Sequence, residues 1–408
     1  MTPRNYPVAV VTDKAKRSLD RGHPWVYADE VLSVCSEYEN GSLVDVCSEK
    51  GTFLGTGFIN DNSKIRIRII SKNANDKFDQ AFWFRRVKYA IDYRKTVMGD
   101  DFSSCRLIFG EADSFPGLTL DKFGDVLVAE VLSLGIEKVK HIIFSAAVKV
   151  LKEYGEDVNV IYERNDVSVR TLEGMQIYKD YYILDGVSNG GNGKTIICEN
   201  NIKYEVDYIN GQKTGFFLDQ KYNRLAASKI AKDKAVLDCF THTGSFALNC
   251  AKAGAKHVTA VDISETAIEQ TKKNASLNGL EDKMDFVCAN VFDLLTDMCN
   301  SKDYKYDYII LDPPAFTKSR ATIDSAKKGY KEINLKAMKL LPRGGYLATC
   351  SCSHFMSDSL FRTMLNDAAR DAGVTLRQIE ARQQCCDHPI LPDVPETNYL
   401  KFYIFQIV

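Results

Sequence analysis

The stretch that decides the fold is VLDCFTHTGSFALNCAKAGAKHVTAVD, residues 236–262. An apolar pair leads into Asp238, and a short polar turn then reaches Gly244. Apolar residues at helical spacing follow as far as Gly254, a residue that suits the end of a helix. A second apolar run ends in Asp262. The order strand, turn, helix, strand and acid predicts a β-α-β unit with parallel strands.

The carboxyl edge of such a sheet is where nucleotide-like ligands bind, and Asp262 can accept hydrogen bonds from both hydroxyls of a ribose there. Phe240 and His242 stand where a glycine-rich dinucleotide loop has glycines. This argues against a bound pyrophosphate and makes a nicotinamide dehydrogenase the weakest option. S-adenosylmethionine has no phosphates and tolerates this turn. The plainer alternative is any α/β domain with an acid after a strand.

The chain has 408 residues, 45% of them hydrophobic and 26% charged, as in ordinary globular proteins. This length allows two or three domains. A net charge of -1 means that a local basic face must hold any nucleic-acid partner.

Twelve cysteines, many within apolar runs, and the lack of an apolar signal segment indicate reduced thiols in a cytoplasmic protein. No apolar run approaches the roughly 18 residues of a membrane span, so we expect a soluble chain with no membrane partner. No Cys/His set has the spacing of a zinc site, and we expect no metal.

Residues 1–75 contain short apolar stretches broken by glycine, which predict a small β-rich module. Basic residues near His23-Pro24-Trp25 suit a phosphate backbone and a stacked base. A solvated basic face with Trp25 in the core is an equal alternative. Residues 76–190 open with a helix at 80–97 and continue as an α+β domain.

Residues 191–408 form the third predicted domain, led by a hairpin at 200–220. Five strands of the parallel type are followed by an antiparallel pair. This pattern predicts an α/β fold with a seven-stranded, doubly wound sheet.

A buried strand at 308–311 stops at Asp312, and two prolines follow. Proline has no N–H, so nearby carbonyl groups are left free to accept hydrogen bonds. An acid and free carbonyls at a strand end can read the edge of a flipped base. An ordinary strand-ending turn is the alternative.

The next strand brings Cys350 and Cys352 to the same edge. Carbon 5 of a pyrimidine accepts a methyl group only after a nucleophile adds at carbon 6, and a thiolate can do this. Cys352 lies at the strand's end and is the better-exposed candidate. Alternatively, both cysteines are small buried strand residues.

Residues 236–262, 312–316 and 351–353 together resemble the class I S-adenosylmethionine-dependent RNA cytosine-C5 methyltransferases. The closer resemblance, over essentially the whole chain, is to the large-subunit (23S) ribosomal RNA cytosine-C5 methyltransferase family. The further motifs that carry it are His23-Pro24-Trp25, Gly110-Glu111-Ala112-Asp113, Pro116-Gly117-Leu118-Thr119, Lys213-Thr214-Gly215 and Leu218-Asp219-Gln220.

The resemblance implies an N-terminal PUA RNA-binding domain, a central α+β domain and a C-terminal Rossmann-like catalytic domain. It implies that Cys352 is the nucleophile and that Asp312 protonates or hydrogen-bonds ring N3 of the cytosine. It also implies S-adenosylmethionine contacts, with Asp262 on the ribose and Asn290 near the adenine. The full implied cofactor set is Phe217, Asp219, Gln220, Asp238, Phe240, Thr243, Gly244, Asp262, Ile263, Asn290, Val291, Asp312 and Pro313.

The chain departs from the family pattern at two positions. Asn290 stands where many methyltransferases have an acid, and Ala315 stands where two-cysteine members have a second cysteine. The base that removes the carbon-5 proton is therefore not identified, and the resemblance gives His354 no role.

Two other functions stay open. An exocyclic-amine RNA methyltransferase uses a similar acid-Pro-Pro motif, although its aromatic residue usually follows directly, and here Ala315 precedes Phe316. A noncatalytic RNA-binding ribosome-assembly factor is opposed by the intact Asp262, Asp312 and Cys352. The modified nucleotide, the form of the RNA substrate and the oligomeric state, with a homodimer among the options, also stay open.

Overall fold

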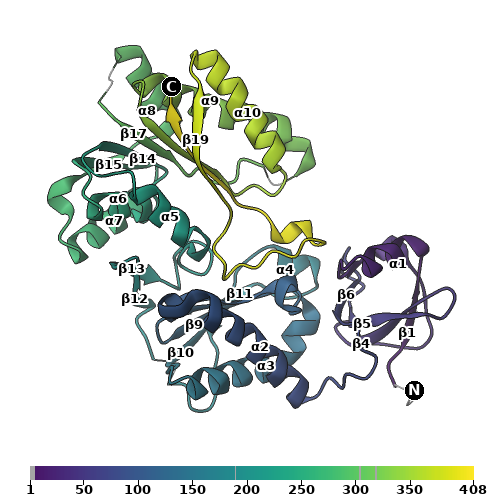
Figure 1. Cartoon of the computed structure of the whole chain (residues 1–408). Helices are drawn as coiled ribbons and strands as arrows, with labels where there is room; N and C mark the ends of the chain where they lie inside the picture. Colours follow the sequence, from purple (N-terminus) through teal and green to yellow (C-terminus); the bar gives the residue numbers. More distant parts are fainter. Residues whose placement is uncertain (1–4, 189, 303–304, 318) are drawn as a thin grey trace. The chain divides into compact units, whose positions relative to one another are not determined.

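The computed structural model describes residues 5–188, 190–302, 305–317 and 319–408 (Figure 1). The chain divides into two compact units. The first consists of Met1–Ile197, Val206–Leu218 and Cys386–Thr397. The second consists of Cys198–Glu205, Asp219–Cys385 and Asn398–Val408. The division falls within the hairpin of β12 (Lys194–Glu199) and β13 (Ile202–Asp207).

The first unit begins with a six-stranded sheet of order β2-β6-β5-β4-β1-β3, which confirms the β-rich module. Its strands are β1 (Val8–Val11), β2 (Trp25–Val26), β3 (Val31–Val34), β4 (Leu43–Ser48), β5 (Phe53–Ile59) and β6 (Ile67–Ser71). Trp25 is neither a fully exposed ring that could stack on a base nor a fully buried core residue. Its side chain is half-buried, and its indole N–H donates to Glu111 at 3.0 Å.

A five-stranded sheet of order β11-β10-β9-β8-β7 completes the first unit. Its elements are β7 (Ser104–Phe109), β8 (Leu118–Phe123), β9 (Val126–Val131), β10 (Val160–Asn165), β11 (Tyr178–Tyr181), α2 (Gln80–Met98) and α3 (Leu134–Glu153). Helix α3 begins at Leu134, one residue before a glycine. Gly135 gives no helix signal in the sequence, but a Cβ there would lie 2.0 Å from Cγ of Phe58.

The second unit is built on a seven-stranded sheet of order β16-β15-β14-β17-β18-β20-β19, as the strand pattern predicts. Its strands are β14 (Ala235–Cys239), β15 (His257–Asp262), β16 (Met284–Cys288), β17 (Tyr308–Leu311), β18 (Tyr346–Ser351), β19 (Leu376–Arg382) and β20 (Lys401–Ile407). The first five are parallel, and β20 lies antiparallel between β18 and β19.

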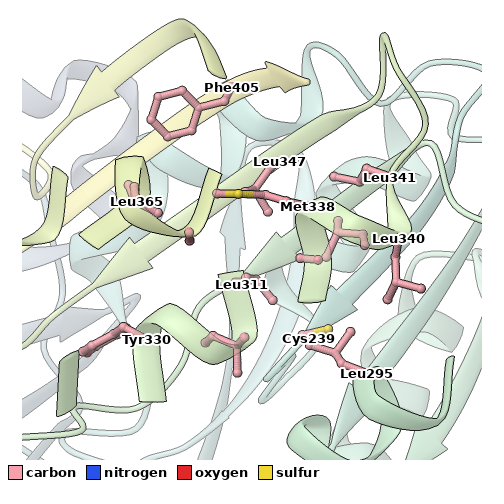
Figure 2. Packing of buried hydrophobic residues seen from close by; sticks show 14 of the residues in the cluster. Cys239, Leu295, Leu311, Tyr330, Met338, Leu340, Leu341, Leu347, Leu365 and Phe405 are labelled. Atoms are coloured by element: carbon pink, nitrogen blue, oxygen red, sulfur yellow. The ribbon is translucent and has the colours of Figure 1, made fainter. Parts of the chain in front are cut away.

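Helices cover both faces of this sheet (Figure 1). One layer holds α5 (Lys221–Ser228), α6 (Ser245–Lys252) and α7 (Glu265–Leu277), and the other holds α8 (Val291–Ser301), α9 (Ile323–Leu340) and α10 (Asp358–Ala372). Figure 2 shows the core under the second layer, where Leu311 and Leu347 of the strands lie near Met338 and Leu365 of the helices. No helix among the described residues has the length and apolar character to span a membrane.

A buried ion pair joins two of the three segments of the second unit. Arg224 in α5 donates to both carboxylate oxygens of Glu199 in β12, at 2.6 and 2.8 Å. The two side chains are 1% and 0% exposed. Two parallel bonds in this geometry satisfy both charges, but loss of one partner would leave a buried charge without compensation.

We therefore expect Arg224→Leu to lower the free energy of unfolding by about 3–5 kcal/mol, because the Glu199 carboxylate stays buried. The change is measured by urea denaturation, monitored by the circular dichroism signal of the helices. The control is Lys272→Ala, which breaks an exposed pair with Glu269 and should cost at most about 1 kcal/mol. Equal losses in the two variants would contradict the assigned role of the buried pair.

Candidate active site

The turn after β14 has an unusual backbone. Phe240 and His242 have positive φ values of 64° and 52°, and Gly244 has φ of 80°. Such conformations are costly for side-chain-bearing residues and are found where surrounding structure enforces them. The turn thus has a glycine-like backbone at two positions without glycine. Burial also lowers the pKa of His242 to about 4, so its ring is neutral at pH 7.

Asp238 is the second-to-last residue of β14, and its carboxyl group hydrogen-bonds residues of this turn and of α6. One carboxylate oxygen accepts from the Thr241 hydroxyl at 2.6 Å and from the backbone N–H of Ala247 in α6 at 3.0 Å. The other oxygen is buried without a hydrogen-bond partner among the described residues. Burial raises the pKa of Asp238 to about 7, against the lowering effect of these bonds.

Asp262 ends β15, the neighbouring strand. Its two oxygens accept from the backbone N–H groups of His242 and Ser264, each at 2.9 Å. These bonds fix the carboxylate at the mouth of the turn, and each oxygen retains a lone pair for a further donor. Ile263 follows with 68% of its side chain exposed, an apolar surface next to the acid.

Asn290 caps helix α8, and its side-chain oxygen accepts from the N–H of Phe292 at 2.9 Å. This oxygen keeps a second lone pair, so the cap bond leaves it able to accept from a further donor. Val291, the next residue in the expected cofactor set, is buried.

Asp312 follows β17 and belongs to a connected polar group. Gln220 donates to its carboxyl group at 3.1 Å, and Asn223 donates to the Gln220 carbonyl oxygen at 2.7 Å. Burial, followed by the charge of Asp219, raises the pKa of Asp312 to about 7. At neutral pH this group is present both as an acid and as a carboxylate, so it can give or accept a proton.

Asp219 lies on the other side of this group. One of its oxygens accepts from the Tyr399 hydroxyl at 2.6 Å, and the other is buried without a partner among the described residues. Sequence reasoning missed Tyr399 and Asn223. The sequence marks neither residue, because each gains its role only when the fold brings it close to Asp219 or Gln220.

The two candidate thiols differ in their surroundings. Cys350 is buried within β18, and its thiol hydrogen-bonds the carboxyl group of Asp312. Cys352 lies just beyond the strand and is only half-buried. Burial, with the charges of Asp312 and Asp219, raises the pKa of Cys352 to about 12.

The carboxyl edge of this sheet thus collects Asp238, Asp262, Asp312 and Cys352, each at or just beyond the end of a parallel strand. Phe217 belongs to the first unit, just before the division of the chain, whereas Asp219 and Gln220 belong to the second. The described part of the chain contains no cluster of three or more His, Cys, Asp or Glu side chains that could hold a metal ion.

Known proteins share this architecture and sequence. Residues 176–406 match the family described as S-adenosylmethionine-dependent methyltransferase, and residues 9–72 match the PUA-like domain. A relative from Pseudoalteromonas translucida (strain TAC 125), named Ribosomal RNA large subunit methyltransferase I, is 40% identical over 96% of this chain and 97% of its own. A relative of the same name from Klebsiella pneumoniae (strain 342) is 36% identical over 100% of both chains.

The chain belongs to the ribosomal RNA large subunit methyltransferase I family. The fold of this methyltransferase also resembles solved structures. A candidate SAM-dependent methyltransferase from Streptococcus mutans has a TM-score of 0.81 at 22% identity, covering 98% of this chain and 99% of its own. The structure of SMU.776 complexed with SAH has a TM-score of 0.82 at 22% identity, with the same coverage.

The residues of this methyltransferase fit S-adenosylmethionine. The cofactor carries an ammonium group, and two buried carboxylate oxygens, on Asp219 and Asp238, have no partner among the described residues. Buried acceptors of this kind require a donor, and an ammonium supplies three. Asp262 can take the ribose hydroxyls, and the exposed Ile263 offers an apolar contact for the adenine.

We expect Gly244→Ala to weaken S-adenosylmethionine binding about tenfold or more, measured by isothermal titration calorimetry. The new Cβ would lie 2.5 Å from Cγ2 of Thr271, at a φ that alanine avoids, so the turn must shift. Gly254→Ala at the other end of α6 is the matched control. It has φ of 94° but no atom closer than 3.8 Å, so it should cost some stability and leave cofactor affinity unchanged. Unchanged affinity in Gly244→Ala would remove this turn from the cofactor site.

Proposed function

We propose that this protein transfers a methyl group from S-adenosylmethionine to carbon 5 of a cytosine in 23S ribosomal RNA through a covalent bond between Cys352 and carbon 6. Relatives that match nearly the whole chain carry the name Ribosomal RNA large subunit methyltransferase I. The choice of carbon 5 rests on the chain's own residues at the sheet edge.

The observation that carries this proposal is the position of Cys352 and Asp312 at the same edge of the sheet. Asp312 lies one residue beyond β17 and Cys352 one residue beyond β18, and these two strands pair in parallel. A thiol next to a carboxyl group that titrates near neutral pH supplies both partners that attack on a pyrimidine ring requires. Methylation of an exocyclic amine needs no thiol, so this pair favours carbon 5.

The steps follow from the roles of these two residues. The cytosine leaves its stack, and the Cys352 thiolate forms a bond to carbon 6 while protonated Asp312 gives its proton to ring N3. Carbon 5 then carries the electron density and takes the methyl group that S-adenosylmethionine supplies. A water molecule or another base then takes the carbon-5 proton, the C6–S bond breaks with its electrons returning to sulfur, and ring N3 gives its proton back to Asp312, which restores the aromatic ring, the thiolate and the protonated acid.

The N-terminal module supports an RNA substrate. The PUA-like match covers residues 9–72, and Tyr27 within it is 38% exposed. Arg68 of β6 lies 5.8 Å from the centre of the Trp25 ring but pairs with Glu111 and Glu173, so Tyr27, just after β2, is the exposed aromatic residue here. An exposed aromatic ring can stack on an unpaired base. The division into domains 1–75, 76–190 and 191–408 is part of this proposal.

We expect a covalent complex when the protein is mixed with S-adenosylmethionine and 23S ribosomal RNA fragments that contain 5-fluorocytidine. Fluorine at carbon 5 blocks the final elimination, so the adduct survives a denaturing gel. Mass spectrometry should place it on Cys352. Cys352→Ala should abolish the adduct, whereas Cys198→Ala, which removes an exposed thiol of β12, should retain it.

Two outcomes would change the assignment. An adduct on Cys350 would keep the chemistry and move the nucleophile to the buried thiol. No adduct on RNA that demonstrably binds would refute carbon-5 methylation and favour the amine reaction.

We expect Asp312→Asn to lower the single-turnover rate of methyl transfer by about 100-fold or more, because the amide cannot give a proton to ring N3. Transfer of radiolabelled methyl groups to ribosomal RNA fragments measures the rate. The matched control is Asp307→Asn, just before the opposite end of β17, where an exposed carboxylate accepts from the N–H of Ala235. A rate within threefold of the wild type in Asp312→Asn would exclude this residue as the proton donor.

A further inference from the structure

A buried lysine lies beside the proposed nucleophile. Lys401 is the first residue of β20 and pairs across the sheet with Ser351, the last residue of β18. It is only 6% exposed, and its Nζ donates to the backbone carbonyls of Ser353 at 2.7 Å and Tyr399 at 2.8 Å. One of these bonds is to the residue that directly follows Cys352.

These two bonds leave one position on Nζ unused. An ammonium has three N–H donors, and both acceptors here are neutral carbonyls. Within the described residues, no carboxylate forms an ion pair with Lys401. Asp358 acts on it only through its charge, while one Asp358 oxygen accepts from the Tyr403 hydroxyl. A buried ammonium without an anion is costly, so this arrangement needs an explanation.

Lys122 in the first unit shows how a buried ammonium is usually neutralised. It is equally buried, at 1% exposure, and donates to the carbonyls of Ser103 and Gly124. Its third position is satisfied by the carboxylate of Glu156 at 2.9 Å. Lys401 has the same two carbonyl bonds but no such acid, and the acidic group that influences it most is the Cys352 thiol.

The groups around Cys352 and Lys401 have opposite effects on the ionisation of the thiol. Burial and the carboxylates of Asp312 and Asp219 oppose ionisation of Cys352, and Lys401 is the cation that favours it most strongly. Burial lowers the pKa of Lys401 to about 8, against the charges of Cys352 and Asp358. The amine form of Lys401 is therefore accessible close to neutral pH. Tyr330 of α9 also faces this region, with its hydroxyl 3.0 Å from that of Ser353.

We propose that Lys401 is the positioning residue that accepts the proton of Cys352 and holds the resulting thiolate as an ion pair. This inference rests on the proposed function, because it gives the nucleophile its proton acceptor. The two carbonyl bonds use the N–H groups of a neutral amine, and the remaining lone pair is free to take a proton.

The proton transfer balances within the pair. The Sγ–H bond breaks, its electrons stay on sulfur, and the Nζ lone pair forms a new N–H bond. Two neutral groups become one ion pair, so the net charge of the buried site does not change. A lone thiolate would bear the full desolvation cost, which a paired thiolate shares with its partner. When the C6–S bond later breaks, its electrons return to a sulfur that faces the same ammonium.

The test measures the thiol itself, without RNA or cofactor. Full-length wild type and Lys401→Met are treated with iodoacetamide between pH 6 and pH 10, and mass spectrometry follows alkylation of the Cys352 peptide. We expect the wild-type rate to rise near pH 8, because the amine must be present to take the proton. At pH 8 the Cys352 thiol of Lys401→Met should react at least about tenfold more slowly than in the wild type. The reason is that a rise of one unit in the thiol pKa lowers the thiolate fraction tenfold.

Lys122→Met is the matched control, because it truncates a buried lysine with the same two carbonyl bonds in the other compact unit, where its cross-strand partner is Cys105 and not Cys352. It should leave the pH profile of Cys352 alkylation unchanged. Lys401→Arg keeps a positive charge but cannot accept a proton, so it should slow alkylation less than Lys401→Met and lose the rise near pH 8.

The wild-type profile alone decides the question if Lys401→Met does not fold. A rise near pH 8 supports the pair, and a Cys352 thiol that stays unreactive up to pH 10 overturns it. Identical profiles for wild type and Lys401→Met also overturn it, even if the 5-fluorocytidine adduct forms on Cys352. The reverse result, a lysine-dependent thiol with no adduct, would refute carbon-5 methylation and leave the pair intact.

Discussion

The parallel register of β14 with β15 and β17 is the constraint on which the site depends. Cys239 aligns with Val261 on one side and with Leu311 on the other. Because the strands run in the same direction, the residues that follow them emerge at one edge, and backbone hydrogen bonds fix the spacing of Asp262 and Asp312. A slip of one residue would turn each side chain to the opposite face of the sheet. The flanking loops therefore refine the site but do not assemble it.

Burial governs the chemistry of this edge. It raises the pKa values of Asp238 and Asp312 to about 7 and that of Cys352 to about 12. A site of this kind prefers neutral groups and penalises isolated charges. It suits a reaction in which protons move between close partners, and it suits a cofactor that brings positive charge to unpartnered carboxylate oxygens. The same desolvation makes isolated buried charges costly, a common feature of functional sites.

The strained turn shows why motif matching alone can mislead. Phe240 and His242 differ from a glycine-rich loop in their side chains, but their backbone adopts the positive φ that glycine normally provides. The N–H of His242 bonds Asp262, and its carbonyl accepts from Thr271 of α7. These tertiary bonds hold a conformation that the local sequence disfavours. A motif rule that considers only residue types along the chain cannot detect such strain.

The sequence by itself determined the seven-stranded sheet, the β-rich first module and the acids at the strand ends. These follow from periodicity and from residues adjacent along the chain, which are local signals. Only the tertiary structure decided that Gln220 donates to Asp312, that Asn290 caps helix α8, and that Lys401 lies beside Cys352. Lys401 reaches its place because β20 returns antiparallel beside β18, a long-range pairing that depends on the whole sheet and leaves no mark in the neighbouring sequence.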